Sequence, residues 1–252
     1  MPKRIFYALI APIIILLLWQ TACSLRLASP WLLPPPLVVW HSFLSTLASG
    51  MLLNNTAASL LRVVQGFSLS VISGCLLAWL LYNLPHIELV LDPVLNFLRM
   101  TPPLATIPLL ILWFGIGETT QLAIIVLASF FPVFLNARAG FARLDAPLKE
   151  LAASLNLKGW LYARYFALPA AFPSIITGVR LGFGYSWRAL IAAELIAAGS
   201  GLGYMIADAE QMQQVDVVIV GIFAIGFTGW GLDAGFKRLI AVLCGRRFPE
   251  LA

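Results

Sequence analysis

The sequence has little charge, few histidines and few cysteines. Only 11% of its 252 residues are charged, against about 25% in ordinary soluble domains, while 61% are hydrophobic. This scarcity of charge excludes a soluble globular protein, and the 16 Phe and 8 Trp exclude a disordered chain. The 2 His and 3 Cys predict neither a multi-His metal site nor a disulfide framework. The chain is therefore expected to lie in a lipid bilayer.

Sequence motifs of enzymes and ATPases are missing as well. There is no G-x-x-x-x-G-K-[ST] phosphate loop, so any ATP hydrolysis must occur on another subunit. The motifs H-E-x-x-H and G-x-S-G are also absent, which argues against a membrane-embedded enzyme. No basic tract typical of nucleic-acid-binding proteins occurs, so no nucleic-acid partner is expected. We therefore expect no catalytic residue, no metal ligand and no cofactor in this chain.

Six apolar segments approach or exceed the length of about 20 residues that a membrane-spanning helix needs. They cover approximately residues 5–25, 57–82, 100–115, 119–141, 172–198 and 216–242. This pattern predicts an all-α polytopic membrane protein with about six transmembrane helices. The first segment could be a signal peptide, but its length favours a retained helix. Pro102 and Pro103 interrupt the third segment, and broken helices at membrane depth usually line a cavity.

The cations predict the orientation of the chain. With the N-terminus in the cytoplasm, the inner stretches hold 12 of the 16 Lys and Arg, and the outer stretches hold only Arg26. The chain then divides into an N-terminal transmembrane helix (1–32), a periplasmic amphipathic segment (33–55), a transmembrane domain (56–243) and a cytoplasmic tail (244–252).

Three cations are assigned to neither side of the membrane, and these, together with Glu194, need a separate explanation: Arg62, Arg180 and Arg188. A charge at mid-bilayer costs at least ~2.5–3.5 kcal/mol, so each should face the protein interior or a partner. At 100° per residue, the three charges of the fifth segment fit one broad helical face. Arg188 could lower the barrier for an anionic substrate, form a structural ion pair or snorkel to the membrane surface. Arg180 and Glu194 suggest gating or inter-helix contacts, and Arg62 could snorkel to the outer surface.

Three glycines lie in the first half of the fifth segment: Gly178, Gly182 and Gly184. Small residues let two helices approach closely within a membrane. The sequence therefore predicts that another helix packs tightly against this one.

The longest predicted cytoplasmic stretch, residues 143–169, contains a short amphipathic helix. Asp145 is a good N-cap, and Asn156 can adopt the left-handed conformation that ends a helix. The apolar stripe between them consists of Leu148, Leu151, Ala152 and Leu155. Such a short helix is marginal in water, so its stripe must be covered. From the pattern alone, the cover could be its own membrane domain, the lipid surface or a cytoplasmic partner.

This stretch resembles the cytoplasmic signature of ABC importer permeases: E-A-A, three residues, G, nine residues, I-x-L-P. The residues that match are Glu150, Ala152, Leu168 and Pro169, and those that depart are Leu151, Asn156 and Phe166. Asn in place of Gly should preserve the turn, because Asn is the non-glycine residue that most readily takes a positive φ.

A second set of motifs resembles permeases for taurine, alkanesulfonates and nitrate, over about residues 33–241. The motifs are Pro102-Pro103-Leu104-Ala105, Trp113-Phe114-Gly115-Ile116-Gly117, Phe130-Phe131-Pro132, Gly178-Val179-Arg180, Trp187, Ala193-Glu194 and Gly201-Leu202-Gly203. The resemblance implies a type I importer permease in the bacterial inner membrane, with residues 143–169 as its coupling loop.

The resemblance also implies partners: a second copy of the permease, two ATPase subunits that bind ATP and Mg²⁺, and a periplasmic or lipid-anchored substrate-binding protein. The residues expected to couple to the ATPase are Glu150, Leu151, Ala152, Leu155, Asn156, Leu168 and Pro169. Those expected in the translocation pathway or its gate are Arg180, Arg188, Glu194, Pro102 and Pro103. The expected substrate is a small anion such as taurine, an alkanesulfonate or nitrate.

Two alternatives stay open at this point. The same resemblance extends to permeases for thiamine precursors, riboflavin and aromatic carboxylates, so the substrate could belong to those classes. The intramembrane Arg and Glu would also suit an ion-coupled secondary transporter or a channel. A self-contained carrier, however, needs no exposed docking helix.

Overall fold

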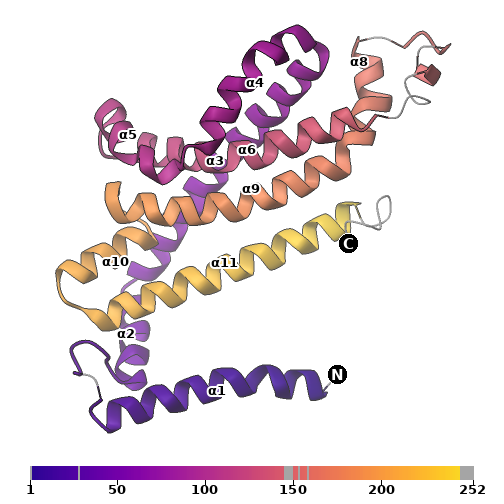
Figure 1. Ribbon diagram of the computed structural model, residues 1–252. Helices are drawn as coiled ribbons and strands as arrows, with labels where there is room; N and C mark the ends of the chain where they lie inside the picture. Colours follow the sequence, from indigo (N-terminus) through magenta and orange to yellow (C-terminus); the bar gives the residue numbers. More distant parts are fainter. Residues whose placement is uncertain (1, 28, 145–149, 153, 158, 245–252) are drawn as a thin grey trace.

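The computed structural model describes residues 2–27, 29–144, 150–152, 154–157 and 159–244, and these residues form helices joined by short connections, without strands (Figure 1). The helices are α1 (Pro2–Ser24), α2 (Pro36–Ala48), α3 (Met51–Asn83), α4 (Pro85–Met100), α5 (Ile107–Phe114), α6 (Glu118–Ala142), α8 (Gly159–Tyr162), α9 (Leu168–Ala197), α10 (Leu202–Gln211) and α11 (Val215–Cys244). A 3-10 turn, η1 (Pro103–Thr106), precedes α5, and a π-helical turn, η2 (Ala163–Ala167), precedes α9. The predicted all-α fold is confirmed.

Four stretches of the described residues are long and apolar enough to cross a membrane. They are α3, α6, the continuous run Gly159–Gln211 that contains α9, and α11 as far as Val242. The pair of α4 and α5 would make a fifth span, although it is bent by 89°. The side chains described in α1 add a shorter apolar stretch, Ile10–Ser24.

The third apolar segment, residues 100–115, is interrupted as predicted, because two consecutive prolines divide it. A residue that precedes proline is pushed out of the helical region of φ and ψ. Thr101 precedes Pro102 and has ψ 119°, and Pro102 precedes Pro103 and has ψ 124°. The chain therefore turns sharply between α4 and α5, at the place where the prolines predict a break.

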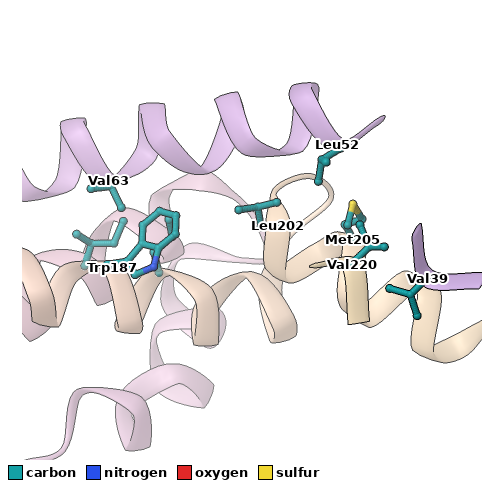
Figure 2. Close-up of a cluster of buried hydrophobic side chains, with 9 residues drawn as sticks. Val39, Leu52, Val63, Trp187, Leu202, Met205 and Val220 are labelled. Carbon is teal, nitrogen blue, oxygen red and sulfur yellow. The ribbon is translucent and has the colours of Figure 1, made fainter. Parts of the chain in front are cut away.

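Three helices, α3, α6 and α9, form the centre of the molecule. Helix α9 runs antiparallel to α6, since Gly140 lies against Ala171 and Gly178 against Pro132. A cluster of buried side chains extends this centre to α2, α10 and α11, as Figure 2 shows with Val39, Leu52, Trp187, Met205 and Val220. The start of α1, the end of α11 and α8 lie toward the right of Figure 1, and α2, α5 and α10 lie toward the left.

The predicted close approach of a helix to the glycines of α9 is confirmed for two of the three. A Cβ on Gly178 would lie 2.6 Å from Asn136 Cβ, and one on Gly182 would lie 2.9 Å from Val133 Cγ2. The prediction is wrong for Gly184, where a Cβ would meet nothing within 4 Å. The backbones of α6 and α9 can touch because no side chain separates them at Gly178 and Gly182.

This difference predicts opposite outcomes for one substitution at two positions of the same helix. Alanine raises helix propensity by about 1 kcal/mol at either glycine. Gly178→Ala should nevertheless lower the free energy of unfolding by about 1–3 kcal/mol, because the new methyl group overpacks the contact with α6. Gly184→Ala should leave it unchanged or slightly raised. Unfolding of both detergent-solubilised variants by denaturant checks this, and equal stability of the two would contradict the packing argument.

Candidate functional site

Glu194, on α9, carries a carboxylate at the centre of a buried polar cluster. The residue is 1% exposed, so its charge needs partners within the protein. Ser59 Oγ lies 2.8 Å from both carboxylate oxygens, and Arg62 Nη1 donates to Oε1 at 2.8 Å. Both partners come from α3, one helical turn apart. The cluster therefore joins α3 to α9 by a buried ion pair and a hydroxyl group.

The same cluster completes the first turn of α10. The first N–H groups of a helix have no partner within it. Here Gly201 N–H donates to Asn55 Oδ1 at 2.8 Å, Leu202 N–H to Ser59 Oγ at 2.9 Å, and Gly203 N–H to Glu194 Oε2 at 3.0 Å. Side chains of α3 and α9 thus cap α10 in place of a residue of its own.

The Gly201-Leu202-Gly203 motif has a physical reason in this cap. Gly201 has φ 114°, which side chains rarely adopt, and a Cβ on it would overlap the Glu194 carboxylate. A Cβ on Gly203 would lie 2.6 Å from Glu194 Cβ. Both glycines are therefore required for the start of α10 to reach the buried carboxylate.

Arg62 is 5% exposed, so the prediction that it snorkels to the surface is wrong. Besides Glu194, its guanidinium donates to Ser200 O at 2.8 Å and to Ser200 Oγ at 2.5 Å. Its Nη2 also lies 4.0 Å from the exposed carboxylate of Glu118, at the start of α6. The side chain thus points inward, toward an acid that lies 132 residues away in the sequence.

Arg188 lies on a different side of α9 from Glu194. It is exposed and lines a cavity of about 520 Å³ beside the α4–α5 bend. The cavity wall consists of Arg99, Thr101, Pro103, Leu104, Leu127, Ala128, Phe131, Pro132, Leu135, Leu181, Tyr185, Arg188 and Ala189. This wall has two cations, two hydroxyl groups and no acid, and Arg188 has no hydrogen bond or ion pair with any residue that the structure describes. We call it the arginine cavity.

The broad charged face predicted on α9 spans two environments. Arg188 and Glu194 are six residues apart, which is about 120° around a helix. Glu194 is buried, whereas Arg188 is exposed. Arg180 is also exposed and lines none of the described cavities. The structure therefore brings Arg188 and Pro103 together, while Pro102 produces the bend. A gating role for Arg180 stays a prediction.

The described part of the coupling loop ends its short helix as predicted. Asn156 has φ 52°, and Leu157 N–H donates to Ala152 O at 3.0 Å, which is the geometry of a left-handed helix stop. Leu151 and Leu155 are 49% and 58% exposed, whereas Ala152 is 2% exposed. The chain itself covers only part of the apolar stripe. Asp145 and Leu148 lie outside the described residues.

Several residues of the buried cluster were not singled out from the sequence: Asn55, Ser59, Gln121 and Ser200. Gln121 is 1% exposed and donates to Ala197 O at 2.7 Å, at the end of α9. The spacing of Ser59 and Arg62, three residues apart in an apolar helix, could have indicated a shared polar face. Nothing in the sequence indicates which acid that face meets.

Comparison with known proteins gives a consistent result. Residues 66–243 match the family described as binding-protein-dependent transport system inner membrane component. A proposed aliphatic sulfonates transport permease of Bacillus subtilis is 38% identical over 232 residues, covering 92% of this chain and 84% of that protein. The taurine transport system permease protein of Escherichia coli is 36% identical over 231 residues, covering 90% and 84%.

Two further similarities are more distant. The bicarbonate transport system permease protein of Synechocystis is 32% identical over 237 residues, covering 89% of this chain and 83% of that protein. A crystal structure of an amino acid ABC transporter superposes with a TM-score of 0.63 at 20% identity, covering 80% of this chain and 96% of that one. At that identity the likeness supports the fold alone.

The buried cluster predicts strong coupling between Arg62 and Glu194. Glu194→Ala leaves a buried guanidinium without its carboxylate and should lower the free energy of unfolding by about 3–5 kcal/mol. The double variant Glu194→Ala with Arg62→Met should lose less free energy of unfolding than the sum of the losses in the two single variants. A double-mutant cycle in detergent measures this difference.

The matched control is Arg138→Met. Arg138 pairs with Glu88 at 2.7 Å and Asp92 at 2.6 Å, but its side chain is 32% exposed. Because water screens these two ion pairs, Arg138→Met should lower the free energy of unfolding by less than about 1 kcal/mol. Additive losses at Arg62 and Glu194 would contradict the assignment of the buried pair.

Proposed function

Because the chain belongs to the family of binding-protein-dependent transport system inner membrane components, we propose that it forms, with a second copy of itself, the translocation pathway of an ATP-driven importer. The family assignment rests on the match over residues 66–243 and on relatives that share 32–38% of their residues with nearly the whole chain. The chain is an ABC importer permease. The proposal extends this assignment to the substrate, the partner subunits and the orientation of the chain in the membrane.

The substrate that we propose is a small organic anion of the sulfonate class. The observation that carries this proposal is the arginine cavity, in which Arg99 and Arg188 face a wall without any acid. Cations without partners are costly at membrane depth and attract an anion. Three relatives are named for aliphatic sulfonates, taurine and bicarbonate, and each of these solutes carries an anionic group. Tyr185 adds a hydroxyl group that could donate to an oxyanion oxygen.

In this proposal the permease itself is not catalytic and holds no cofactor. ATP and Mg²⁺ bind to two separate ATPase subunits, which contact the coupling loop. The exposed side chains of Glu150, Leu151 and Leu155 support such a contact, since an apolar helix face in water needs a cover. Leu168 and Pro169 then begin α9, so that the loop continues directly into a membrane-spanning helix.

The proposed orientation has both termini and the coupling loop in the cytoplasm of a bacterial cell, with the chain crossing the inner membrane several times. The start of α1, the end of α11 and α8 lie at one end of the molecule in Figure 1, which agrees with the inward bias of Lys and Arg. The opposite end, with α2 and α10, would then receive a periplasmic or lipid-anchored substrate-binding protein.

Leu155→Asp tests the coupling loop. A carboxylate in the apolar contact should release the ATPase, so the permease purified in mild detergent should lack its stoichiometric ATPase and show no ATP-driven uptake. Leu27→Asp is the matched control, because Leu27 is 74% exposed, follows the C-terminal end of α1 and lies outside the coupling loop. The Leu27→Asp permease should retain the ATPase. A Leu155→Asp protein that keeps its ATPase and transports normally would contradict the coupling role, and uptake by the wild-type chain alone without ATP would indicate a carrier.

Substitutions of Arg188 test whether the substrate is an anion that binds this side chain. Arg188→Ala should lower the initial rate of radiolabelled taurine uptake about tenfold, since a charge-assisted hydrogen bond contributes roughly 1.5–3 kcal/mol. Arg188→Lys, which keeps the charge, should retain part of the rate. Amounts of permease and ATPase in the membrane, measured by immunoblot, control for assembly. Wild-type uptake in Arg188→Ala would return this side chain to a structural role.

A further inference from the structure

A pair of tyrosines joins the coupling loop to a membrane-spanning helix. The hydroxyl oxygens of Tyr82, near the end of α3, and Tyr162, at the end of α8, lie 2.8 Å apart. The ring of Tyr82 stacks on Phe141 of α6 with centroids 5.7 Å apart, and Trp79 lies 5.4 Å from Phe141. Tyr162 in turn stacks on Phe166. This aromatic cluster therefore connects α3, α6 and α8 through one polar contact and several ring contacts.

The covalent path from the coupling loop into α9 passes through a weak place in the helix. Pro169 has no N–H, and its ring would clash with the carbonyl four residues earlier in a regular α-helix. The chain accommodates the proline by widening into the π-helical turn Ala163–Ala167, where Leu168 N–H bonds to Ala163 O. Such turns are rare and often mark functional sites. Movement of α8 can thus be absorbed at this turn before it reaches α9.

The other end of α3 is held firmly. Arg62 and Ser59 attach it to Glu194 of α9 inside a region that excludes water. Tyr82 is 20 residues further along α3 than Arg62, a distance of about 30 Å. A buried ion pair resists exchange with water, whereas two half-buried phenol groups can exchange partners readily. At its end beside the coupling loop, α3 packs on α6 through the buried Ala78 and Leu81, and the tyrosine pair is the polar contact through which that end meets α8.

We propose that the Tyr82–Tyr162 hydrogen bond, supported by the aromatic cluster, transmits movement of the coupling loop to α3, which then turns about its attachment at Glu194. This inference rests on the proposed importer function and assigns Tyr82 and Tyr162 as positioning residues for the coupling of ATP hydrolysis to transport. Neither residue lines the arginine cavity. The pair acts in parallel with the covalent path through the π-helical turn.

The test uses Tyr82→Phe, Tyr162→Phe and the double variant, each in the intact importer complex in proteoliposomes with its binding protein and with taurine as the probe. These changes remove the hydroxyl groups and keep the rings. The complex should assemble and hydrolyse ATP, while the amount of taurine moved per ATP should fall about fivefold, as expected for the loss of one hydrogen bond. The double variant should be no worse than either single variant, because each single change already breaks the bond.

Tyr165→Phe is the matched control. Its side chain lies three residues beyond Tyr162, is 61% exposed, and makes no hydrogen bond to any residue that the structure describes. It should leave the ratio of transport to hydrolysis unchanged. A wild-type ratio in both Tyr82→Phe and Tyr162→Phe, or an equal loss in Tyr165→Phe, would overturn the inference while leaving the importer function intact. Absence of ATP-dependent uptake by the wild-type complex would overturn the importer function itself.

Discussion

The ion pair between Glu194 and Arg62 is the interaction on which the arrangement of the helices depends. The free-energy cost of burying the Glu194 carboxylate, which is 1% exposed, would be prohibitive without partners. The protein supplies these partners from two directions. Helix α3 contributes a cation and a hydroxyl group, and the start of α10 contributes a backbone N–H. Meeting this one requirement determines the position of α3 on α9, the turn after α9, and the need for glycine at positions 201 and 203.

This arrangement leaves the opposite side of α9 free for a different purpose. The close contact with α6 at Gly178 and Gly182 sets the spacing of the two helices. Beside that contact, the proline-induced bend between α4 and α5 opens the arginine cavity. One helix therefore carries a neutralised charge on its packed side and, on its open side, a cation that pairs with none of the described residues. The first stabilises the fold, and the second is available to an anion.

The two ends of the molecule differ in the same way. At the end with α10, the buried Arg62 and Glu194 pair with each other and join α3 to α9, although Arg62 Nε has no hydrogen-bond partner among the described residues. At the end with the coupling loop, Leu151, Leu155 and Trp160 are exposed, and the contact between α3 and α8 is a single hydroxyl pair supported by rings. A buried apolar cluster that includes Leu81, Phe141 and Ala171 holds α3, α6 and α9 together there. A buried ion pair thus characterises one end of the molecule, and apolar packing characterises the other.

Composition and pattern by themselves determined the membrane class, the helical fold, the break at Pro102 and Pro103, the left-handed stop at Asn156 and the resemblance to importer permeases. These features depend on one residue or on near neighbours, so the chain displays them locally. Only the tertiary structure decided that Arg62 is buried, that Glu194 and Arg188 serve different sides of α9, and that Tyr82 meets Tyr162. The contacts of Arg62 and of Tyr82 join residues 132 and 80 positions apart, and the packing of helices decides which residues meet over such separations.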